Sequence, residues 1–226
     1  MEQQELDNFE RRFILGLVQD LKSYAVLDGS LKDYFQDMSC EDLSMMISLK
    51  KKLIFSSEFE ESFRDFERKL VNEDQETKRK STYDNARMTC ANAVGAERFR
   101  KGLLERHREI RHEIGRLHDL ARSLKSFSNE KAEFNYEIVN DLNIPLQLKD
   151  CFSMAYSLTS RHPVTLLTAS HDVARLYAEM HRREKITENG RKRFELALVY
   201  PQEGSFSYLY PGLVKSEDFA DLFEAA

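Results

Sequence analysis

The chain has 226 residues, 41% of them hydrophobic and 15 of them Phe, which predicts a folded globular protein with a sizeable core. Its formal net charge of −5 argues against a protein that coats nucleic acid along its whole length, although a local basic patch is compatible with it. Three widely spaced cysteines without a C-x-x-C pair predict neither a zinc site nor a disulfide framework. The mixed-charge amino terminus and the lack of an apolar run near about 18 residues predict a cytoplasmic protein that does not contact the membrane.

The amino-terminal part of the chain alternates helices with short apolar runs. Apolar residues three and four positions apart predict an amphipathic helix over residues 5–22. The run at 24–27 predicts a strand that ends at Asp28-Gly29, although this pair is equally an ordinary turn dipeptide. Ser39 is a good N-cap for the next helix, with Asp42 in the capping-box position.

A second apolar run at 52–55 predicts another strand, which leads into a helix with phenylalanines on one face. The first turns of this helix carry three glutamates, Glu58, Glu60 and Glu61. The helix dipole stabilises acids at that place, so some of them are simply favourable helix starters. Residues 72–80 are charged and lack large apolar side chains, which predicts a solvated helix surface or a loop.

Residues 98–125 show the clearest helical pattern in the chain. Two series recur every seventh residue, one with Leu103, Ile110, Leu117 and Leu124, the other with His107, Ile114 and Ala121. Such a seam needs a partner helix, either the preceding segment around 83–94 in an antiparallel hairpin or a second chain. Nine Lys or Arg against four acids predict either contact with phosphates or an ordinary mixed-charge solvated face.

The stretch 148–176 carries two acids around one helix and one strand. Asp150 lies in the first turn of the helix, and the strand at 164–167 is followed by Thr168, Ser170 and Asp172. Ligands of open α/β sheets bind outside the carboxyl ends of the strands, which is where we expect Asp172. Stabilisation of a helix start is the alternative role for either acid. A late strand is predicted at 194–200, before Pro201.

These apolar runs, each followed by an acid-bearing turn or helix, are typical of a parallel α/β sheet. At one edge of such a sheet, Asp28, one glutamate between positions 58 and 61, Asp150 and Asp172 would converge. Converging carboxylates repel one another, and a divalent cation keeps them ionised together. Oxygen ligands of this kind suit Mg²⁺ or Mn²⁺, which can activate water for attack on a phosphodiester.

Four segments resemble the PIN-domain nucleases: YAVLDGS, KLIFSSEFEESF, DCFSMAYSL and HPVTLLTASHDVARL. They are similar to that family's opening strand with its acid, its second strand with a glutamate-bearing helix, an acid before a small-residue helix, and a strand ending in Thr before a later Asp. The resemblance covers residues 24–63 and 148–200. It implies a PIN-like parallel sheet flanked by helices, built from residues 1–70 and 146–226, with a coiled-coil-like helical hairpin inserted at 71–145.

The resemblance implies four catalytic acids, of which the three aspartates bind the metal: Asp28, Glu61, Asp150 and Asp172. Thr168 and Ser170 would support the site. Ser170 stands where the family often has an acid, which leaves Asp172 two residues late. Three glutamates, Glu58, Glu60 and Glu61, lie near the place where the family has its glutamate, so the resemblance leaves open which of them faces the site.

The implied activity is that of a hydrolase, an endoribonuclease that uses Mg²⁺ or Mn²⁺ to cleave RNA, with single strands favoured. We expect basic side chains of the long helix to hold the RNA: Arg100, Lys101, Arg108, Arg111 and Arg116. The alternative is a non-catalytic interaction protein or pseudoenzyme that binds a protein partner, or a second copy of itself as a homo-oligomer, through residues 98–125. A third hypothesis, a purely helical regulator, requires LLTAS and ALVY to be helical.

Overall fold

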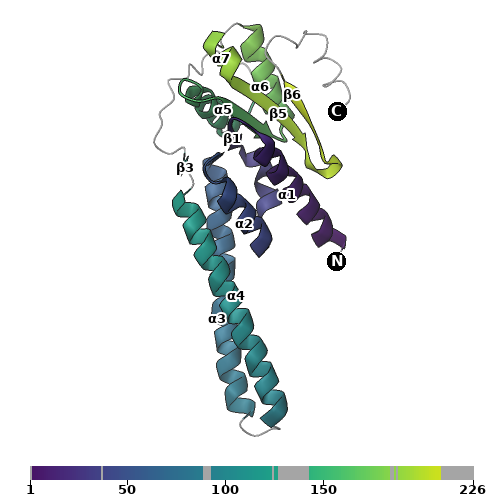
Figure 1. Ribbon diagram of the computed structural model, residues 1–226, viewed down its shortest axis with the longest axis vertical. Coiled ribbons are helices and arrows are strands. Elements are labelled where there is room, and N and C mark those ends of the chain that lie inside the picture. The colour runs from purple at the N-terminus through teal and green to yellow at the C-terminus, as the bar shows by residue number, and fades with distance from the viewer. Residues whose placement is uncertain are drawn as a thin grey trace.

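The computed structural model describes residues 2–36, 38–88, 93–123, 125–126, 143–183, 186 and 188–209, without the side chains at 2–8, 57, 60, 81–88, 93–100, 121, 123, 125–126, 188–189 and 191. At its centre is a six-stranded sheet in the order β3-β2-β1-β4-β5-β6 (Figure 1). The strands are β1 (Tyr24–Leu27), β2 (Leu53–Phe55), β3 (Lys125–Ser126), β4 (Val164–Thr168), β5 (Phe194–Tyr200) and β6 (Ser205–Leu209). The first five are parallel, and β6 pairs antiparallel with β5.

This arrangement confirms the predicted α/β class. The strands expected at 24–27, 52–55, 164–167 and 194–200 correspond to β1, β2, β4 and β5. The hypothesis of a purely helical regulator is wrong, because LLT ends β4 and ALVY lies within β5. The sequence analysis did not predict β3 or β6. With only two residues, β3 is too short for a recognisable pattern, and the first three residues of β6 are exposed.

Helices cover both faces of the sheet. They are α1 (Glu2–Asp20), α2 (Cys40–Leu49), α3 (Ser57–Met88), α4 (Ala93–Ser123), α5 (Leu146–Leu158), α6 (His171–Arg182) and α7 (Glu188–Arg193), with the 3-10 turns η1 (Gly29–Phe35) and η4 (Pro201–Glu203). Buried strand residues alternate between the two faces, as the period of a strand requires. Leu27 and Phe55 belong to the core with α1, α2 and α3, whereas Val26 and Ile54 belong to the core with α5 and α6.

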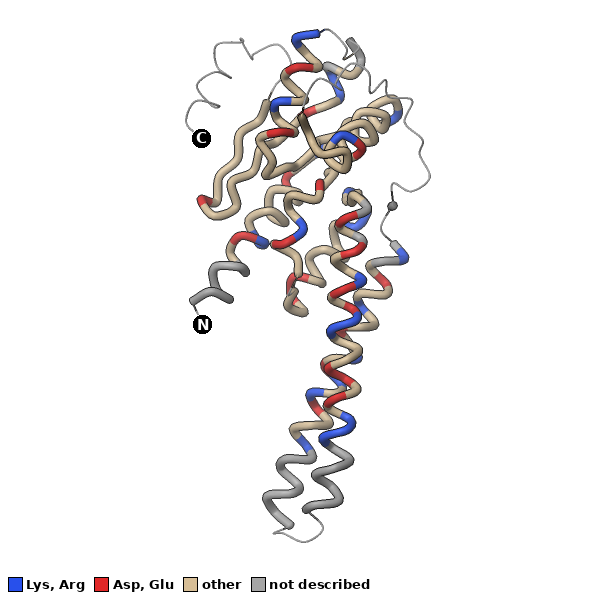
Figure 2. The backbone as a smooth tube through the Cα atoms, turned by 180° about the vertical axis from the view of Figure 1, so that it is seen from behind, with Lys and Arg blue, Asp and Glu red and all other residues tan. Residues whose placement is uncertain are grey.

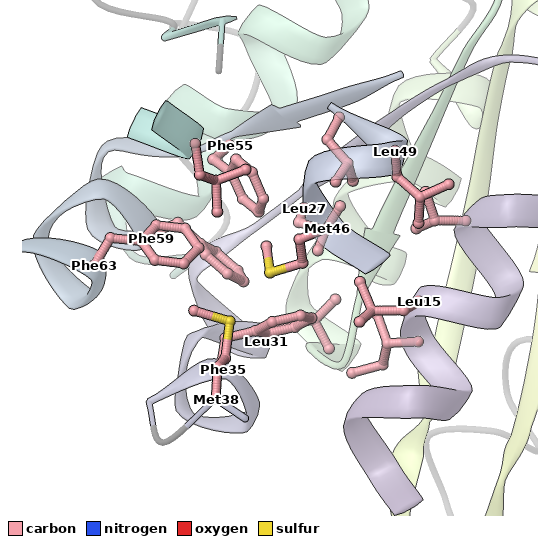
Figure 3. Close-up of a cluster of buried hydrophobic side chains, with 14 of the residues drawn as sticks. Leu15, Leu27, Leu31, Phe35, Met38, Met46, Leu49, Phe55, Phe59 and Phe63 are labelled. Atoms are coloured by element: carbon pink, nitrogen blue, oxygen red, sulfur yellow. The ribbon is translucent and has the colours of Figure 1, made fainter. Parts of the chain in front are cut away.

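Aromatic rings pack around the start of α3, next to the end of β2 (Figure 3). The ring centroids of Phe55 and Phe59 are 4.7 Å apart, and those of Phe55 and Phe63 are 5.5 Å apart in an edge-on contact. Phe35 of η1 packs on Phe59 with centroids 5.2 Å apart. Because these rings hold the first turns of α3, they also fix the position of its second residue, Glu58.

A buried ion pair joins α1 to α2. Arg11 Nη1 lies 2.7 Å from Asp42 Oδ2, and the two side chains are 3% and 1% exposed. The predicted capping box of Ser39 and Asp42 is confirmed, so Asp42 serves both the start of α2 and the ion pair. Replacing Arg11 would leave the buried Asp42 carboxylate with only the more distant Arg12 Nε, at 3.8 Å, as a cation among the described residues.

The helices α3 and α4 form an antiparallel hairpin, called the arm below, that extends away from the sheet (Figure 1). Three apolar residues of α4 are buried in the core cluster that includes α3: Ile110, Leu117 and Leu120. The seam predicted for 98–125 therefore has an intramolecular partner, and that partner is an α3 that already begins at Ser57. Leu124 of the predicted seam lies outside the described residues. Since α3 runs unbroken through residue 70, the boundary expected there falls inside a helix.

Candidate functional site

In the strand order, β1 lies between β2 and β4. The strands β2 and β3 follow on one side of β1, and β4, β5 and β6 follow on the other, so the strand order reverses direction at β1. In open α/β folds this switch point opens a crevice at the carboxyl ends of the strands, where ligands bind. Leu27 of β1 is in register with Leu167 of β4, so Asp28, which follows β1, lies beside Thr168, the last residue of β4. The backbone N–H of Asp28 donates to the carbonyl of Leu167 at 3.3 Å, which continues the pairing. The fold thus brings Asp28 and Thr168 together at the switch point.

Asp28 is fully buried and is the N-cap of η1. Its Oδ1 accepts a hydrogen bond from the backbone N–H of Ser30 at 3.0 Å and another from the Ser30 hydroxyl. The hydrogen bonds to Oδ1 are those of an N-cap, because an Asp at this position commonly accepts from the first free N–H groups of a helix. The other half has a different environment. Oδ2 is buried and has no hydrogen-bond partner among the described residues.

Glu58 is the glutamate that lies against this site. A Cβ added to Gly29 would stand 1.4 Å from Glu58 Oε2, so the carboxylate occupies the space that glycine leaves beside Asp28. The start of α3 is held there by the backbone N–H of Ser56, which donates to the carbonyl of Leu27 at 3.2 Å. Glu61, the glutamate implied by the family resemblance, is exposed on the next turn of α3. The side chain of Glu60 is outside the description.

The electrostatics of the site reflect this crowding of acids. Burial is the main cause that raises the pKa of Asp28 to about 6, and the charge of Glu58 adds to the rise. The hydrogen bonds from Ser30 and the nearby Thr168 hydroxyl act in the opposite direction and lower this pKa. Burial also raises the pKa of the Cys151 thiol on α5, and the charges of Asp28, Glu58 and Asp150 raise it further. Three of the expected acids therefore lie close enough to this thiol for their charge to act on it.

Asp150 and Asp172 occupy different places relative to this group. Asp150 is half-buried and is the fifth residue of α5, which begins at Leu146, so the expectation that it lies in the first turn of its helix is wrong. It lies next to Cys151 in the chain. Asp172 is half-buried in the first turn of α6, where the helix dipole stabilises an acid. It is not among the acids that most strongly affect the pKa values of Asp28 and Cys151. Ser170, the N-cap of α6, donates its backbone N–H to Thr168 Oγ1 at 2.9 Å.

The switch point offers few protein ligands to a divalent cation. In the part of the chain that is described, no three side chains of His, Cys, Asp or Glu are placed to hold one metal ion together. Mg²⁺ is commonly held by one or two carboxylates, with water and substrate phosphates as its other ligands. Asp28 Oδ2, buried without a hydrogen-bond partner among the described residues, is the atom that such an ion would satisfy, and the charge of Glu58 acts on the same carboxylate.

The basic side chains expected to hold RNA divide into two groups. Lys101, Arg108 and Arg111 are exposed on α4. Arg116 is half-buried, and its guanidinium donates to the Cys40 carbonyl and to Ser44, which ties the arm to α2. Figure 2 shows basic and acidic residues intermixed along both helices of the arm. The side chain of Arg100 lies outside the described residues.

Sequence reasoning missed Ser30. Its hydroxyl accepts a hydrogen bond from the backbone N–H of Ala169 at 2.8 Å and lies 3.3 Å from Thr168 Oγ1. The signal available in the sequence was the spacing Asp-x-Ser after a strand, which favours a capped turn. That pattern gives no hint that the same hydroxyl contacts a strand 138 residues away.

Comparisons of the chain with protein-family models, with curated proteins and with solved structures find no match. Across the described residues, no helix combines the length and the apolar character needed to cross a membrane. The chemistry of the switch point is therefore the basis on which a function can be inferred.

Proposed function

We propose that this protein is a metal-dependent endoribonuclease with a PIN-like core, whose site lies at the carboxyl ends of β1 and β4. One observation carries the proposal: Asp28 Oδ2 is buried at the switch point without a hydrogen-bond partner among the described residues, while Glu58 lies against the neighbouring Gly29 and its charge acts on Asp28. Keeping a buried carboxylate ionised next to a second acid is unfavourable unless a cation lies between them. The segments that resemble PIN-domain nucleases add support, since Asp28 and Asp150 come from two of them.

The residues divide the work as follows. Asp28 and Glu58 would hold an Mg²⁺ or Mn²⁺ ion, and Asp150 would add negative charge from α5 to the same region. The bound ion would activate water and stabilise the leaving oxygen of the phosphodiester. Thr168 and Ser30 would keep Asp28 in place, while Asp172 would act mainly at the start of α6.

RNA is the proposed substrate, held partly by the exposed basic side chains of α4, Lys101, Arg108 and Arg111. Each phosphate that these residues neutralise should make binding weaken as salt increases. Single strands fit best, because a flexible strand can reach both the switch point and the arm. A triple substitution of these three residues to Gln should reduce the salt dependence of RNA binding, measured by fluorescence anisotropy.

Cleavage of a labelled, mixed-sequence single-stranded RNA tests the proposal. We expect cleavage with Mn²⁺ or Mg²⁺, none with EDTA, and none from Asp28→Asn or Glu58→Gln. Glu76→Gln is the matched control, because Glu76 is an exposed glutamate further along the same helix. Cleavage that survives EDTA, or that Asp28→Asn retains, would contradict a metal site at Asp28.

A second candidate function, binding of a protein partner or a second copy, rests on the arm. The arm continues well past the sheet, and Leu104 of α4 is 48% exposed on it. Light scattering on the full chain would detect self-association, which Leu104→Ser should weaken. Leu146→Ser is the matched control, since Leu146 is 62% exposed on α5, away from the arm. A monomer at all concentrations would count against self-association.

A further inference from the structure

Every hydrogen-bonding group of the Ser30 hydroxyl is directed at the switch point. A serine hydroxyl has one proton to donate and two lone pairs that accept. The proton goes to Asp28 Oδ1, and one lone pair accepts from the backbone N–H of Ala169 at 2.8 Å. The second lone pair faces Thr168 Oγ1 at 3.3 Å. Because Thr168 Oγ1 itself accepts from the N–H of Ser170, the Thr168 proton remains available for Ser30.

This hydroxyl joins two segments that are far apart in the chain. Ser30 lies in η1, directly after β1, whereas Ala169 directly follows β4. The hydroxyl therefore joins the carboxyl ends of β1 and β4 at the switch point. Its bond to Asp28 Oδ1, together with that of its own backbone N–H, leaves Oδ2 as the oxygen without a partner among the described residues.

We propose that Ser30 is a positioning residue, which holds the carboxylate of Asp28 in one orientation so that Oδ2 is presented to a divalent cation. The inference rests on the proposed function, because it takes Asp28 as a metal ligand. The terminal torsion of an aspartate is soft, so an unrestrained carboxylate could turn either oxygen, or neither, towards the ion. Partners that orient a metal ligand typically change metal affinity by about 10–100-fold when they are removed.

The test is the dissociation constant of Mn²⁺ alone, measured on the full chain at pH 7.5 by electron paramagnetic resonance of the free ion. We expect Asp28→Asn to abolish binding and Ser30→Ala to weaken it by about 10–100-fold. Ser30→Thr, which keeps the hydroxyl, should bind nearly as well as the wild type. Ser160→Ala is the matched control, since Ser160 is an exposed serine whose hydroxyl donates to the Ser157 carbonyl.

The outcomes separate this inference from the proposed function. Wild-type affinity in Ser30→Ala, together with loss of binding in Asp28→Asn, overturns the role of Ser30 and leaves the metal site standing. Absence of Mn²⁺ binding by the wild type overturns both. If Ser30 only stabilises the fold, Ser30→Ala should have a lower unfolding temperature than the wild type and the same Mn²⁺ affinity. If Ser30→Ala does not fold, Ser30→Cys gives the same comparison, because a thiol is only a weak donor, and unchanged affinity there refutes the inference.

Discussion

Replacing Asp28 by Asn should change how the stability of the protein depends on pH. In the folded protein, burial first of all raises the pKa of Asp28 from 3.8 to about 6. Between these two pH values the folded chain binds a proton that the unfolded chain has released, so the wild type loses stability as pH rises through this window. The loss is absent below about pH 4 and complete above about pH 6. Asn has no charge to bury, so the Asp28→Asn variant should not lose stability in this pH range for this reason.

The size of the effect follows from the rise of the pKa, which corresponds to about 3 kcal/mol of unfolding free energy. Asn keeps an oxygen that can accept from Ser30, but its buried amide N–H₂ would lack an acceptor, which costs about 1–3 kcal/mol. That cost does not vary with pH. Since a small part of the wild type's loss has already occurred at pH 4, the stability of the variant relative to the wild type should increase by about 2–2.5 kcal/mol from pH 4 to pH 7.5.

Urea unfolding followed by circular dichroism at pH 4 and pH 7.5 measures this change, with EDTA present to remove metal. Asp119→Asn is the control, because Asp119 is an exposed aspartate on α4 and should show no such change. A constant difference between Asp28→Asn and the wild type at both pH values would refute the reasoning. Adding Mn²⁺ at pH 7.5 should then stabilise the wild type and leave Asp28→Asn unchanged.

Three further predictions follow from the contacts around the site and the core. Glu58→Gln should abolish Mn²⁺-dependent RNA cleavage, whereas Glu61→Gln should retain most of it, because Glu58 lies against Gly29 and Glu61 is exposed; equal losses would contradict this assignment. Gly29→Ala should fold but weaken Mn²⁺ binding, measured by calorimetry, since its Cβ would displace the Glu58 carboxylate. Arg11→Met should lower the unfolding free energy by up to about 3–5 kcal/mol in urea titrations, because it leaves the buried Asp42 carboxylate with only the more distant Arg12 Nε, at 3.8 Å, as a cationic partner among the described residues.

The sequence by itself determined the local elements and the acids that follow them. Apolar runs of strand length placed β1, β2, β4 and β5, and the acid after the first run placed Asp28 at a strand end. The capping box at Ser39 and the seven-residue period of α4 were also recognisable. These features depend on residues within one or two turns of each other, so periodicity and capping preferences are enough to find them.

Only the tertiary structure decided which of these residues meet. The pairing of β1 with β4 brings Ser30 to Ala169, a contact between positions 139 residues apart that no local pattern encodes. The choice of Glu58 over Glu61 depends on the rotational setting of α3, which the rings of Phe55, Phe59 and Phe63 fix by packing. Likewise, the seam of α4 suits any helix of matching period, and α3 is its partner because the chain folds back on itself. Contacts between distant segments depend on how whole elements pack, which a linear pattern does not contain.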